Sequence, residues 1–413
     1  MLALFGGPPV RSRPFPSWPI FGDEEEARLL RTLRSGKWGR LHGQEVSEFE
    51  QRFASMHGCA HGIAVVNGTV SLRIALMAAG IRAEDEVIVP PYTFISTASA
   101  VVEANAIPVF ADVDLKTFNL DPAAVESAIT PRTRAIIPVH FAGQPAEMDA
   151  IVEIARARNL VVIEDAAHAH GASYRGRPAG SLGHLASFSF QSSKNLTAGE
   201  GGIITTNDDR LAESCRSIQN CGRVPGGVWY EHHVIAGNYR LGEFQGAVLN
   251  GQLDRLEEQA RTRDANGRDL ASRIERLPGL HPQARSAACT RHSYHLFMLR
   301  IDAAEFGAPR AAVLRAMEAE GIPCGAGYGF SLPQQPLFRN KAFGPYLSGA
   351  SPGLDYREVR CPASDLLCRE QAIWLEQHLL LGSTADTEDI ATAFEKIYEH
   401  REVLKDSALV AGG

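Results

Sequence analysis

The sequence predicts an α/β protein in which a large domain with a mostly parallel sheet precedes a smaller α/β domain. Three observations lead to this fold class. Within residues 60–205, short apolar runs rich in β-branched residues alternate with segments of helical periodicity. The runs are almost continuously apolar, as in strands that helices cover on both faces. After residue 240 the alternation stops, and a long helical stretch begins.

The strand and helix segments of the first part come in pairs. A helix predicted by DEEEARLLRTLRSG precedes them. The pairs are GIAVV with SLRIALMAAG, EVIVP with PYTFISTASAVVEAN, IPVFADVD with DPAAVESAI, and AIIPVH with MDAIVEIARARN. Three further strands are predicted by LVVIEDAA, ASFSF and GGIITTN. Ligands of open α/β sheets bind outside the carboxyl ends of the strands, so the polar residues that follow these runs are candidates for a site.

The part of the chain after residue 240 shows weaker patterns. The stretch that begins EFQGAVLNG and ends RIERL predicts one long helix between two domains. SYHLFMLRI predicts a strand, APRAAVLRAMEAEG a helix, and QAIWLEQHLLLG a buried strand or helix. We therefore expect a large domain at 14–250, a linking helix at 251–277 and a small α/β domain at 278–413.

The composition is that of a globular protein with room for two cores, because the chain has 413 residues, 45% of them hydrophobic and 22% charged. The net charge of −7 argues against nucleic acid or an anionic membrane as a partner. No apolar run reaches the roughly 18 residues of a membrane span, and no signal-peptide pattern opens the sequence. Seven scattered cysteines without CxxC spacing favour the cytoplasm and predict no metal site.

Two of the predicted strand ends carry residues suited to charged ligands. Asn67, Gly68 and Thr69 form a glycine turn that opens a helix, where free N–H groups and the helix dipole favour a phosphate. A plain capped turn is the structural alternative. LVVIEDAAHAHG places Asp165 at the end of a buried strand, where a carboxylate needs a cationic partner such as a protonated ring nitrogen. Capping of the next helix is the alternative role for Asp165.

An aromatic residue and a lysine follow two other strands. Phe94 can stack on a flat ring, although aromatic residues in such positions also serve as core. Lys194, in FSFQSSKNLTAGEGG, is either a solvated surface amine or a shielded amine that forms a Schiff base with an aldehyde. Pyridoxal phosphate needs donors for its phosphate, a carboxylate for its ring nitrogen, a flat neighbour and an amine for its aldehyde. The combination therefore favours this cofactor.

The order and the amino-acid sequences of several segments resemble those of the DegT/DnrJ/EryC1/StrS family of sugar and cyclitol aminotransferases. The segments are NGT, DEVIVPPYTFISTASAV, PVFADVD, IIPVHFAG, EDAAHAHGA, FSFQSSKNLTAGEGG and GNYRLGEFQGAVL. They follow the family order through most of 14–270, whereas the C-terminal third matches more loosely. The resemblance implies fold type I of the pyridoxal-phosphate-dependent transferases, as in aspartate aminotransferase, and a ping-pong transamination.

Carried over by position, the resemblance assigns roles around the cofactor ring. Lys194 would form the covalent aldimine with pyridoxal 5'-phosphate and move the proton as the cofactor passes to pyridoxamine phosphate. Asp165 would pair with the pyridine nitrogen, and His168 takes the place of a family Gln or His near the ring hydroxyl. Phe94 and Ala167 would contact the two faces of the ring.

The phosphate contacts implied by the resemblance come from two subunits. Gly68, Thr69 and Ser189 would bind the phosphate from one chain, and Asn238 would reach it from the neighbouring subunit. This implies a homodimer with shared active sites. The glycine- and aromatic-rich loop 222–237 would then be a mobile flap with substrate contacts across the dimer, or else a disordered surface segment.

The resemblance also limits the reaction and its substrates. A dehydratase branch of the family has histidine at the position of Lys194, so the lysine favours transamination from L-glutamate or L-glutamine. FPSWP, SGKWGR, EDAAHAHG and TAGEGG are closest to inosose aminotransferases of aminocyclitol antibiotic biosynthesis and to 3-amino-5-hydroxybenzoate synthases. We therefore favour an inosose-like ketone as the acceptor. The candidate substrate contacts, each with a structural role as its alternative, are Trp38, Arg40, Trp229, Tyr230 and Arg240.

Three other functions stay open at this point. More typical family members aminate nucleotide-linked keto sugars. A 3-amino-5-hydroxybenzoate synthase-like lyase would aromatise an aminated ring with the same cofactor. A non-catalytic regulator would bind the cofactor without turnover, but intact Lys194, Asp165 and NGT argue against it, and the acidic chain shows no basic helix-turn-helix.

Overall fold

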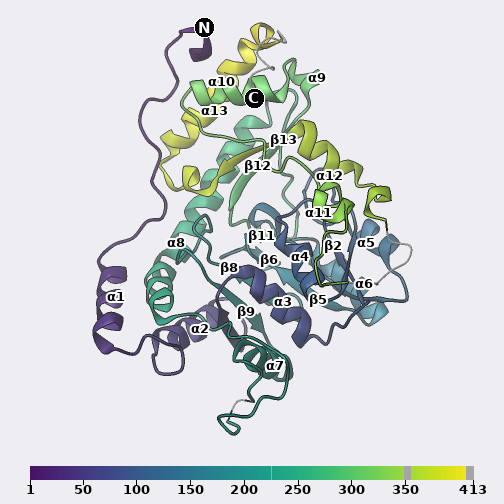
Figure 1. Cartoon of the computed structure of the whole chain (residues 1–413). Helices are drawn as coiled ribbons and strands as arrows, with labels where there is room; N and C mark the ends of the chain where they lie inside the picture. Colours follow the sequence, from purple (N-terminus) through teal and green to yellow (C-terminus); the bar gives the residue numbers. More distant parts are fainter. Residues whose placement is uncertain (225, 348–354, 406–413) are drawn as a thin grey trace.

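The computed structural model describes residues 1–224, 226–347 and 355–405. Its largest sheet has seven strands in the order β1-β9-β8-β5-β4-β2-β3. Strands β2, β5, β8 and β9 of this sheet are labelled in Figure 1. The strands are β1 (His61–Val65), β2 (Glu86–Val89), β3 (Ile107–Phe110), β4 (Thr133–Ile136), β5 (Val161–Asp165), β8 (Leu185–Ser189) and β9 (Gly202–Thr206). Strand β9 is antiparallel to β1 and β8, and the other pairs are parallel. The predicted mostly parallel sheet is confirmed.

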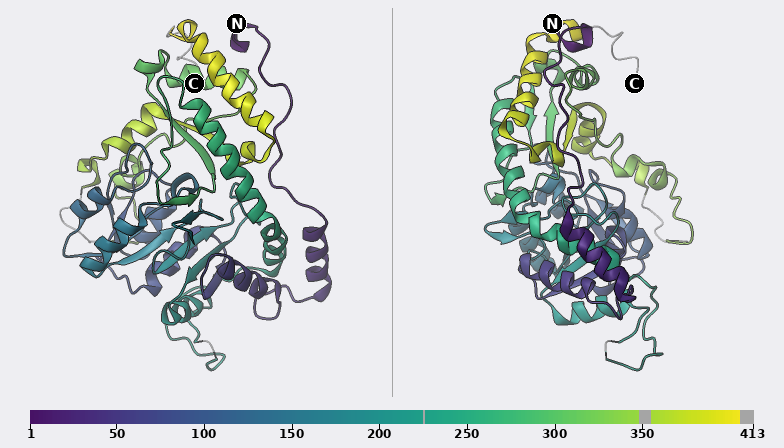
Figure 2. Two further views of the ribbon diagram at one scale, coloured as in Figure 1. Left: turned by 180° about the vertical axis from the view of Figure 1, so that it is seen from behind. Right: turned by 90° about the vertical axis from the view of Figure 1, so that its left-hand side faces the viewer.

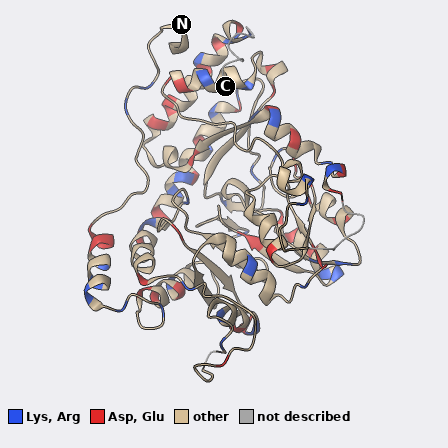
Figure 3. Ribbon diagram, viewed as in Figure 1, with Lys and Arg blue, Asp and Glu red and all other residues tan. Residues whose placement is uncertain are grey.

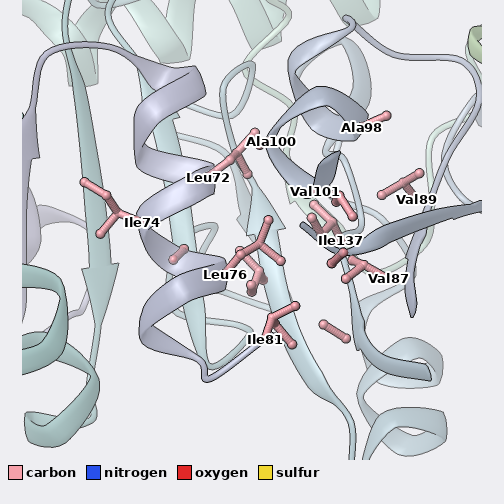
Figure 4. Close-up of a cluster of buried hydrophobic side chains, with 14 of the residues drawn as sticks. Leu72, Ile74, Leu76, Ile81, Val87, Val89, Ala98, Ala100, Val101 and Ile137 are labelled. Carbon is pink, nitrogen blue, oxygen red and sulfur yellow. The ribbon is translucent and has the colours of Figure 1, made fainter. Parts of the chain in front are cut away.

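Helices cover both faces of this sheet because successive strand residues point to opposite sides. The helices are α2 (Glu45–Met56), α3 (Gly68–Ala78), α4 (Ser96–Glu103), α5 (Pro122–Ala128), α6 (Met148–Arg158) and α7 (Asp209–Gln219). On one face, Val87 of β2 packs among Leu76 of α3 and Val101 of α4 (Figure 4). On the other face, Ile88 of β2 packs with Ile151 of α6. This two-sided burial explains why the strands read as continuous apolar runs.

One long helix runs from the first sheet to the C-terminal part of the chain (Figures 1 and 2). This helix, α8 (Glu243–Ile274), has 32 residues, and α1 (Asp23–Ser35) and α2 pack beside its first half. Gly246 and Gly251 permit this packing, since an added Cβ would lie 2.8 Å from the Val46 nitrogen and 2.9 Å from Glu25 Cγ. Helix α13 (Thr384–Glu399) packs beside the second half.

A second sheet has its own core. Its strands are β10 (Leu280–Pro282), β12 (Leu296–Ile301) and β13 (Ala372–Glu376), all antiparallel in the order β10-β12-β13. They pack against α10 (Arg310–Ala319) and α13. A small third sheet joins β6 (Ser173–Tyr174), β7 (Arg177–Pro178) and β11 (Cys289–Arg291). The short helices are α9 (Ala303–Phe306), α11 (Pro336–Arg339) and α12 (Pro362–Leu366).

The C-terminal elements agree with the sequence patterns, with one ambiguity resolved. SYHLFMLRI contains β12, and APRAAVLRAMEAEG contains α10. QAIWLEQHLLLG, predicted as strand or helix, forms both in succession, β13 and then the 3₁₀ helix η6 (Gln377–Leu381). Helix α8 begins before the linking helix predicted at 251–277, and the division of the chain into domains stays a prediction.

Charged residues of both signs are interspersed along the outer helices (Figure 3). Arg28 of α1, for example, forms ion pairs with Glu24 of its own helix and with Glu45 and Glu48 of α2. In the described part of the chain, no helix is both long and apolar enough to cross a membrane.

Candidate active site

A cavity of about 430 Å³ opens at the carboxyl ends of the central strands. Eight of the nine predicted cofactor contacts line it, from the N-terminus of α3, the segment after β2, and the ends of β5 and β8 with the loops that follow them. These residues are Gly68, Thr69, Phe94, Asp165, Ala167, His168, Ser189 and Lys194. The structure therefore brings together residues that are up to 126 positions apart in the sequence.

The N-terminus of α3 forms one end of the cavity. The Asn67 side chain caps the helix by accepting from the Val70 N–H at 2.9 Å, so the first N–H groups remain available to a ligand. Gly68 lies directly against β8, because an added Cβ would lie only 2.7 Å from the Ser189 Cβ. Thr69 is fixed by a 2.6 Å hydrogen bond between its hydroxyl and that of Ser96. This end suits a phosphate.

Asp165 ends β5 and is 5% exposed. Its carboxylate accepts from the Thr97 hydroxyl at 2.8 Å and from the Ala167 N–H at 3.2 Å. Burial raises the pKa of Asp165, and these hydrogen bonds and the charge of Lys194 oppose that rise. Among the described residues, Asp165 has no ion-pair partner within salt-bridge distance. A bound cation such as a protonated ring nitrogen would supply the missing charge.

Lys194 follows β8 and is half-buried in the same cavity. Burial lowers the pKa of its amine to about 8, although the charge of Asp165 raises it. At neutral pH the unprotonated fraction of such a lysine is far larger than that of an ordinary lysine, which makes it a competent nucleophile. The alternative of a solvated surface amine does not fit this environment.

His168 is a neutral hydrogen-bond donor. Its Nδ1 accepts from the Ala142 N–H at 3.3 Å, so the proton resides on Nε2. Burial holds the pKa of His168 well below its usual value, and the charge of Lys194 lowers it further. Phe94 is 58% exposed and lines the cavity, so it is not a core aromatic.

The second carboxylate at the end of β5, Glu164, has a structural role rather than a chemical one. It is fully buried, accepts from His140 Nε2 at 2.8 Å and accepts from the N–H groups of Gly180, Leu182 and Gly183. Burial opposes its ionisation, but the hydrogen bond and charge of His140 and the backbone donors together lower the pKa of Glu164. The pair fixes β5 to the turn before β8.

The predicted substrate contacts do not reach this cavity within one chain. Trp38 donates to the Leu33 carbonyl at 3.1 Å, and Arg40 pairs with the buried Glu50 at 2.6 Å. Arg240 donates to Asn220 Oδ1 at 2.7 Å. Within one chain, these three residues therefore have the structural roles that were the alternatives to substrate binding. Their contacts with a substrate stay predictions.

The segment 222–237 carries the other two candidates. Trp229 and Tyr230 are 73% and 75% exposed, and Asn238, which follows the segment, lies outside the cavity of its own chain. This is the placement that a contact across a dimer requires, and the contact itself stays a prediction.

Sequence reasoning missed several residues of the site. Thr97, which holds Asp165, also bonds Thr93 at 3.0 Å, and both lie one helical turn apart in PYTFIST. Two threonines spaced four residues apart on a predicted helix are a sequence signal for hydroxyl groups on one face, next to the site. A second cavity of about 510 Å³ shares Phe94, His168 and Lys194 with the first. Its other walls come from the second sheet and the segments beside it, among them His295, Tyr328, Trp374 and Gln377.

Comparison with known proteins agrees with this geometry. The 3-amino-5-hydroxybenzoate synthase of Amycolatopsis mediterranei is 39% identical over 370 residues, 89% of this chain and 93% of that protein. The L-glutamine:2-deoxy-scyllo-inosose aminotransferase of Streptomyces kanamyceticus is 38% identical over 421 residues, 98% of each. A crystal structure of 3-amino-5-hydroxybenzoic acid synthase superposes with a TM-score of 0.86 at 36% identity, covering 95% of this chain and 100% of that one.

The fold is therefore the predicted α/β fold of the pyridoxal-phosphate-dependent aminotransferases. The model of the DegT/DnrJ/EryC1/StrS aminotransferase family matches residues 19–373. The chain is an enzyme that belongs to the DegT/DnrJ/EryC1/StrS aminotransferase family.

Proposed function

We propose that the protein transfers an amino group from L-glutamine or L-glutamate to the keto group of a cyclitol or sugar, with an inosose-like ketone as the favoured acceptor. Family membership implies pyridoxal phosphate as the cofactor. The observation that carries the proposal is the amine of Lys194, whose pKa is lowered to about 8, in one cavity with Asp165 and the N-terminus of α3.

The residues of the cavity fit this cofactor. When bound, pyridoxal phosphate supplies an aldehyde carbon that accepts amines and a ring that takes up electrons. Gly68, Thr69 and Ser189 would hold its phosphate beside the N–H groups of α3. Asp165, a buried carboxylate without an ion-pair partner among the described residues, would keep the ring nitrogen protonated.

Lys194 would act through Nζ as both nucleophile and proton carrier. Its unprotonated form can attack a carbonyl carbon and can take a proton from a substrate carbon. His168 would donate from Nε2 to the ring oxygen of the cofactor. Because burial keeps His168 neutral, it would hold that oxygen without adding a second cation beside Lys194.

The names of the relatives support the acceptor class. The inosose aminotransferase of Streptomyces kanamyceticus covers nearly this whole chain, and it acts with L-glutamine on a cyclic ketone by its name. The similarity to 3-amino-5-hydroxybenzoate synthase favours, as the second candidate, an aromatising reaction on an aminated ring. Both substrates are small rings, in contrast to a nucleotide-linked keto sugar.

The test is the visible absorption spectrum of the protein with pyridoxal phosphate, before and after addition of L-glutamine. We expect a yellow band that bleaches with the donor and that is absent in Lys194→Ala. The bleached enzyme is then offered keto-cyclitols, nucleotide keto sugars and aminated ring precursors in separate reactions. A band that persists in Lys194→Ala would refute the role of Lys194, and recovery of the band with nucleotide keto sugars alone would refute the acceptor.

The proposal includes a homodimer in which Asn238 of each chain reaches the phosphate in the other. The exposed segment before Asn238, and the position of Asn238 outside its own cavity, support this exchange. The proposed location is the cytoplasm, which the seven cysteines support, since all of them are free.

A further inference from the structure

Two neighbouring polar residues that line the second cavity, His295 and Gln377, have no role in the proposed chemistry. Leu296 pairs with Glu376 at the end of the β12–β13 ladder. The next residues on each side, His295 and Gln377, therefore lie opposite each other just beyond it. Both side chains line the cavity that Lys194 also lines, and they are 6% and 2% exposed.

The hydrogen bonds of His295 fix which of its nitrogens carries the proton. Asn195, the neighbour of Lys194, donates from Nδ2 to the Ser293 carbonyl at 2.8 Å, so its Oδ1 faces His295. His295 Nδ1 must then donate to Asn195 Oδ1 at 3.2 Å. Burial, together with His168 and the charge of Lys194, holds the pKa of His295 well below its usual value. Its Nε2 is therefore a bare acceptor.

Hydrogen bonds also fix the orientation of the Gln377 amide, but they leave a donor free rather than an acceptor. Arg263 can only donate, and it does so twice to Gln377 Oε1, from Nε at 2.9 Å and from Nη2 at 2.5 Å. The amide Nε2 of Gln377 is thereby turned away from Arg263 as a donor. Neither this nitrogen nor His295 Nε2 has a hydrogen-bond partner in the described part of the chain, and neither is fully enclosed. The pair thus offers one donor and one acceptor to a ligand.

We propose that Gln377 and His295 recognise the side-chain carboxamide of the amino donor and that His295 thereby selects L-glutamine over L-glutamate, an inference that rests on the proposed function. The carboxamide oxygen would accept from Gln377 Nε2, and the carboxamide N–H would donate to His295 Nε2. A carboxylate has no proton to donate, so one of its oxygens would face the lone pair of His295. Leaving a buried polar group unpaired in this way weakens binding by about tenfold or more.

The same pair is compatible with the second substrate. A ping-pong enzyme binds its donor and its acceptor in one cavity, and a hydroxyl group both donates and accepts. A ring hydroxyl of the acceptor can therefore use either group after the donor has left. A neutral pair serves an amide and an alcohol alike, whereas a cationic side chain at either position would favour the carboxylate.

Binding of two stable conjugates to the cofactor-free protein tests the inference without turnover. N-(5′-phosphopyridoxyl)-L-glutamine and N-(5′-phosphopyridoxyl)-L-glutamate share every cofactor contact and differ only at the side-chain terminus. By titration calorimetry we expect the glutamine conjugate to bind about tenfold tighter or more. Single-turnover bleaching by the free amino acids should show the same preference.

Two variants separate the roles of the pair. His295→Phe keeps a ring beside His168 but removes the acceptor, so we expect the preference to fall to about threefold or less. Gln377→Met removes the donor, so both conjugates should weaken while the preference remains. His281→Phe, in β10 of the same sheet but outside the cavity, is the matched control, and it should behave as wild type. Circular dichroism of each variant checks folding.

The outcomes are distinct for the inference and for the proposed function. Equal binding of the two conjugates, or a preference that survives in folded His295→Phe, would overturn the inference and leave the aminotransferase proposal intact. If neither conjugate binds the wild-type protein, the cofactor site itself is wrong and the proposed function fails.

Discussion

At the residue scale, the site depends on side chains that burial holds in unusual protonation states. Lys194 has its pKa lowered to about 8, and Asp165 has its pKa raised, each against the charge of the other. His168 and His295 remain neutral at the same depth. Such groups lower the stability of the folded protein when no cofactor is bound. Residues with this combination of burial and shifted pKa gather at functional sites.

Replacement of Lys194 by methionine should therefore stabilise the cofactor-free protein. An unfolded lysine has a pKa near 10.4, so the unfolded chain binds the Lys194 proton more tightly than the folded chain does. The stability of the wild type consequently rises as the pH increases from about 8 to about 10.4. By calorimetry we expect Lys194→Met to melt a few degrees higher at pH 7, with the difference shrinking toward pH 10. A difference that does not change with pH would contradict the lowered pKa.

At the scale of elements, the phosphate end of the cavity depends on the close approach of α3 to β8. An added Cβ on Gly68 would lie 2.7 Å from the Ser189 Cβ, and neither element can yield without moving part of the core. Such overpacking costs about 1–3 kcal/mol. The N–H groups of α3 and the hydroxyl of Ser189 would move apart together, so stability and cofactor binding should be lost in parallel.

Gly68→Ala tests this coupling. We expect a lower melting temperature and a weaker affinity for pyridoxal phosphate, measured by titration of the visible band. Gly39→Ala serves as the stability control, because an added methyl there meets nothing within 4 Å. If Gly68→Ala has the same melting temperature as Gly39→Ala and binds the cofactor with wild-type affinity, the close approach of α3 to β8 is not required for cofactor binding.

The elements also show how much of the fold can be predicted from the sequence. The strands and the residues that follow them were predictable because local patterns define them and because parallel strands end at one edge. QAIWLEQHLLLG stayed ambiguous because a short apolar run lacks periodicity, and only the pairing of β13 with β12 decides it. The same register brings His295 opposite Gln377, which no local pattern could reveal.

Long-range partners limited the prediction of individual side chains. Arg40 and Arg240 were candidate substrate contacts as isolated cations, but in the chain they bond Glu50 and Asn220. Glu164 and Asp165 are neighbours of like charge in the sequence, and the strand turns them to opposite sides. His140, which pairs with Glu164, lies 24 residues away, so no local pattern could reveal the structural role of Glu164.

At the scale of the whole molecule, one chain holds most but not all of the proposed site. Asn238 and the exposed Trp229 and Tyr230 lie away from the cavity that contains Lys194. Segment 222–237 also contains Ile235, which is 94% exposed. Exposed apolar side chains that gather on one segment are typical of an interaction surface. A second copy of the chain would bury this segment and complete the site.

Mixed dimers test this exchange between chains. Lys194→Ala lacks the amine in both sites, and Asn238→Asp faces each phosphate with a like charge, so each pure dimer should be inactive. A hybrid dimer with sites shared between chains has one site with both residues intact and one site with neither. Random mixing makes half of the dimers hybrids, so unfolding and refolding the two proteins together should restore about a quarter of the wild-type activity. Mixing Lys194→Ala with Asp165→Asn is the control, because both residues line the cavity of one chain and no hybrid site is intact. Activity that returns in neither mixture would place Asn238 in the site of its own chain. Activity in both mixtures would mean that Lys194 and Asp165 of one site come from different chains.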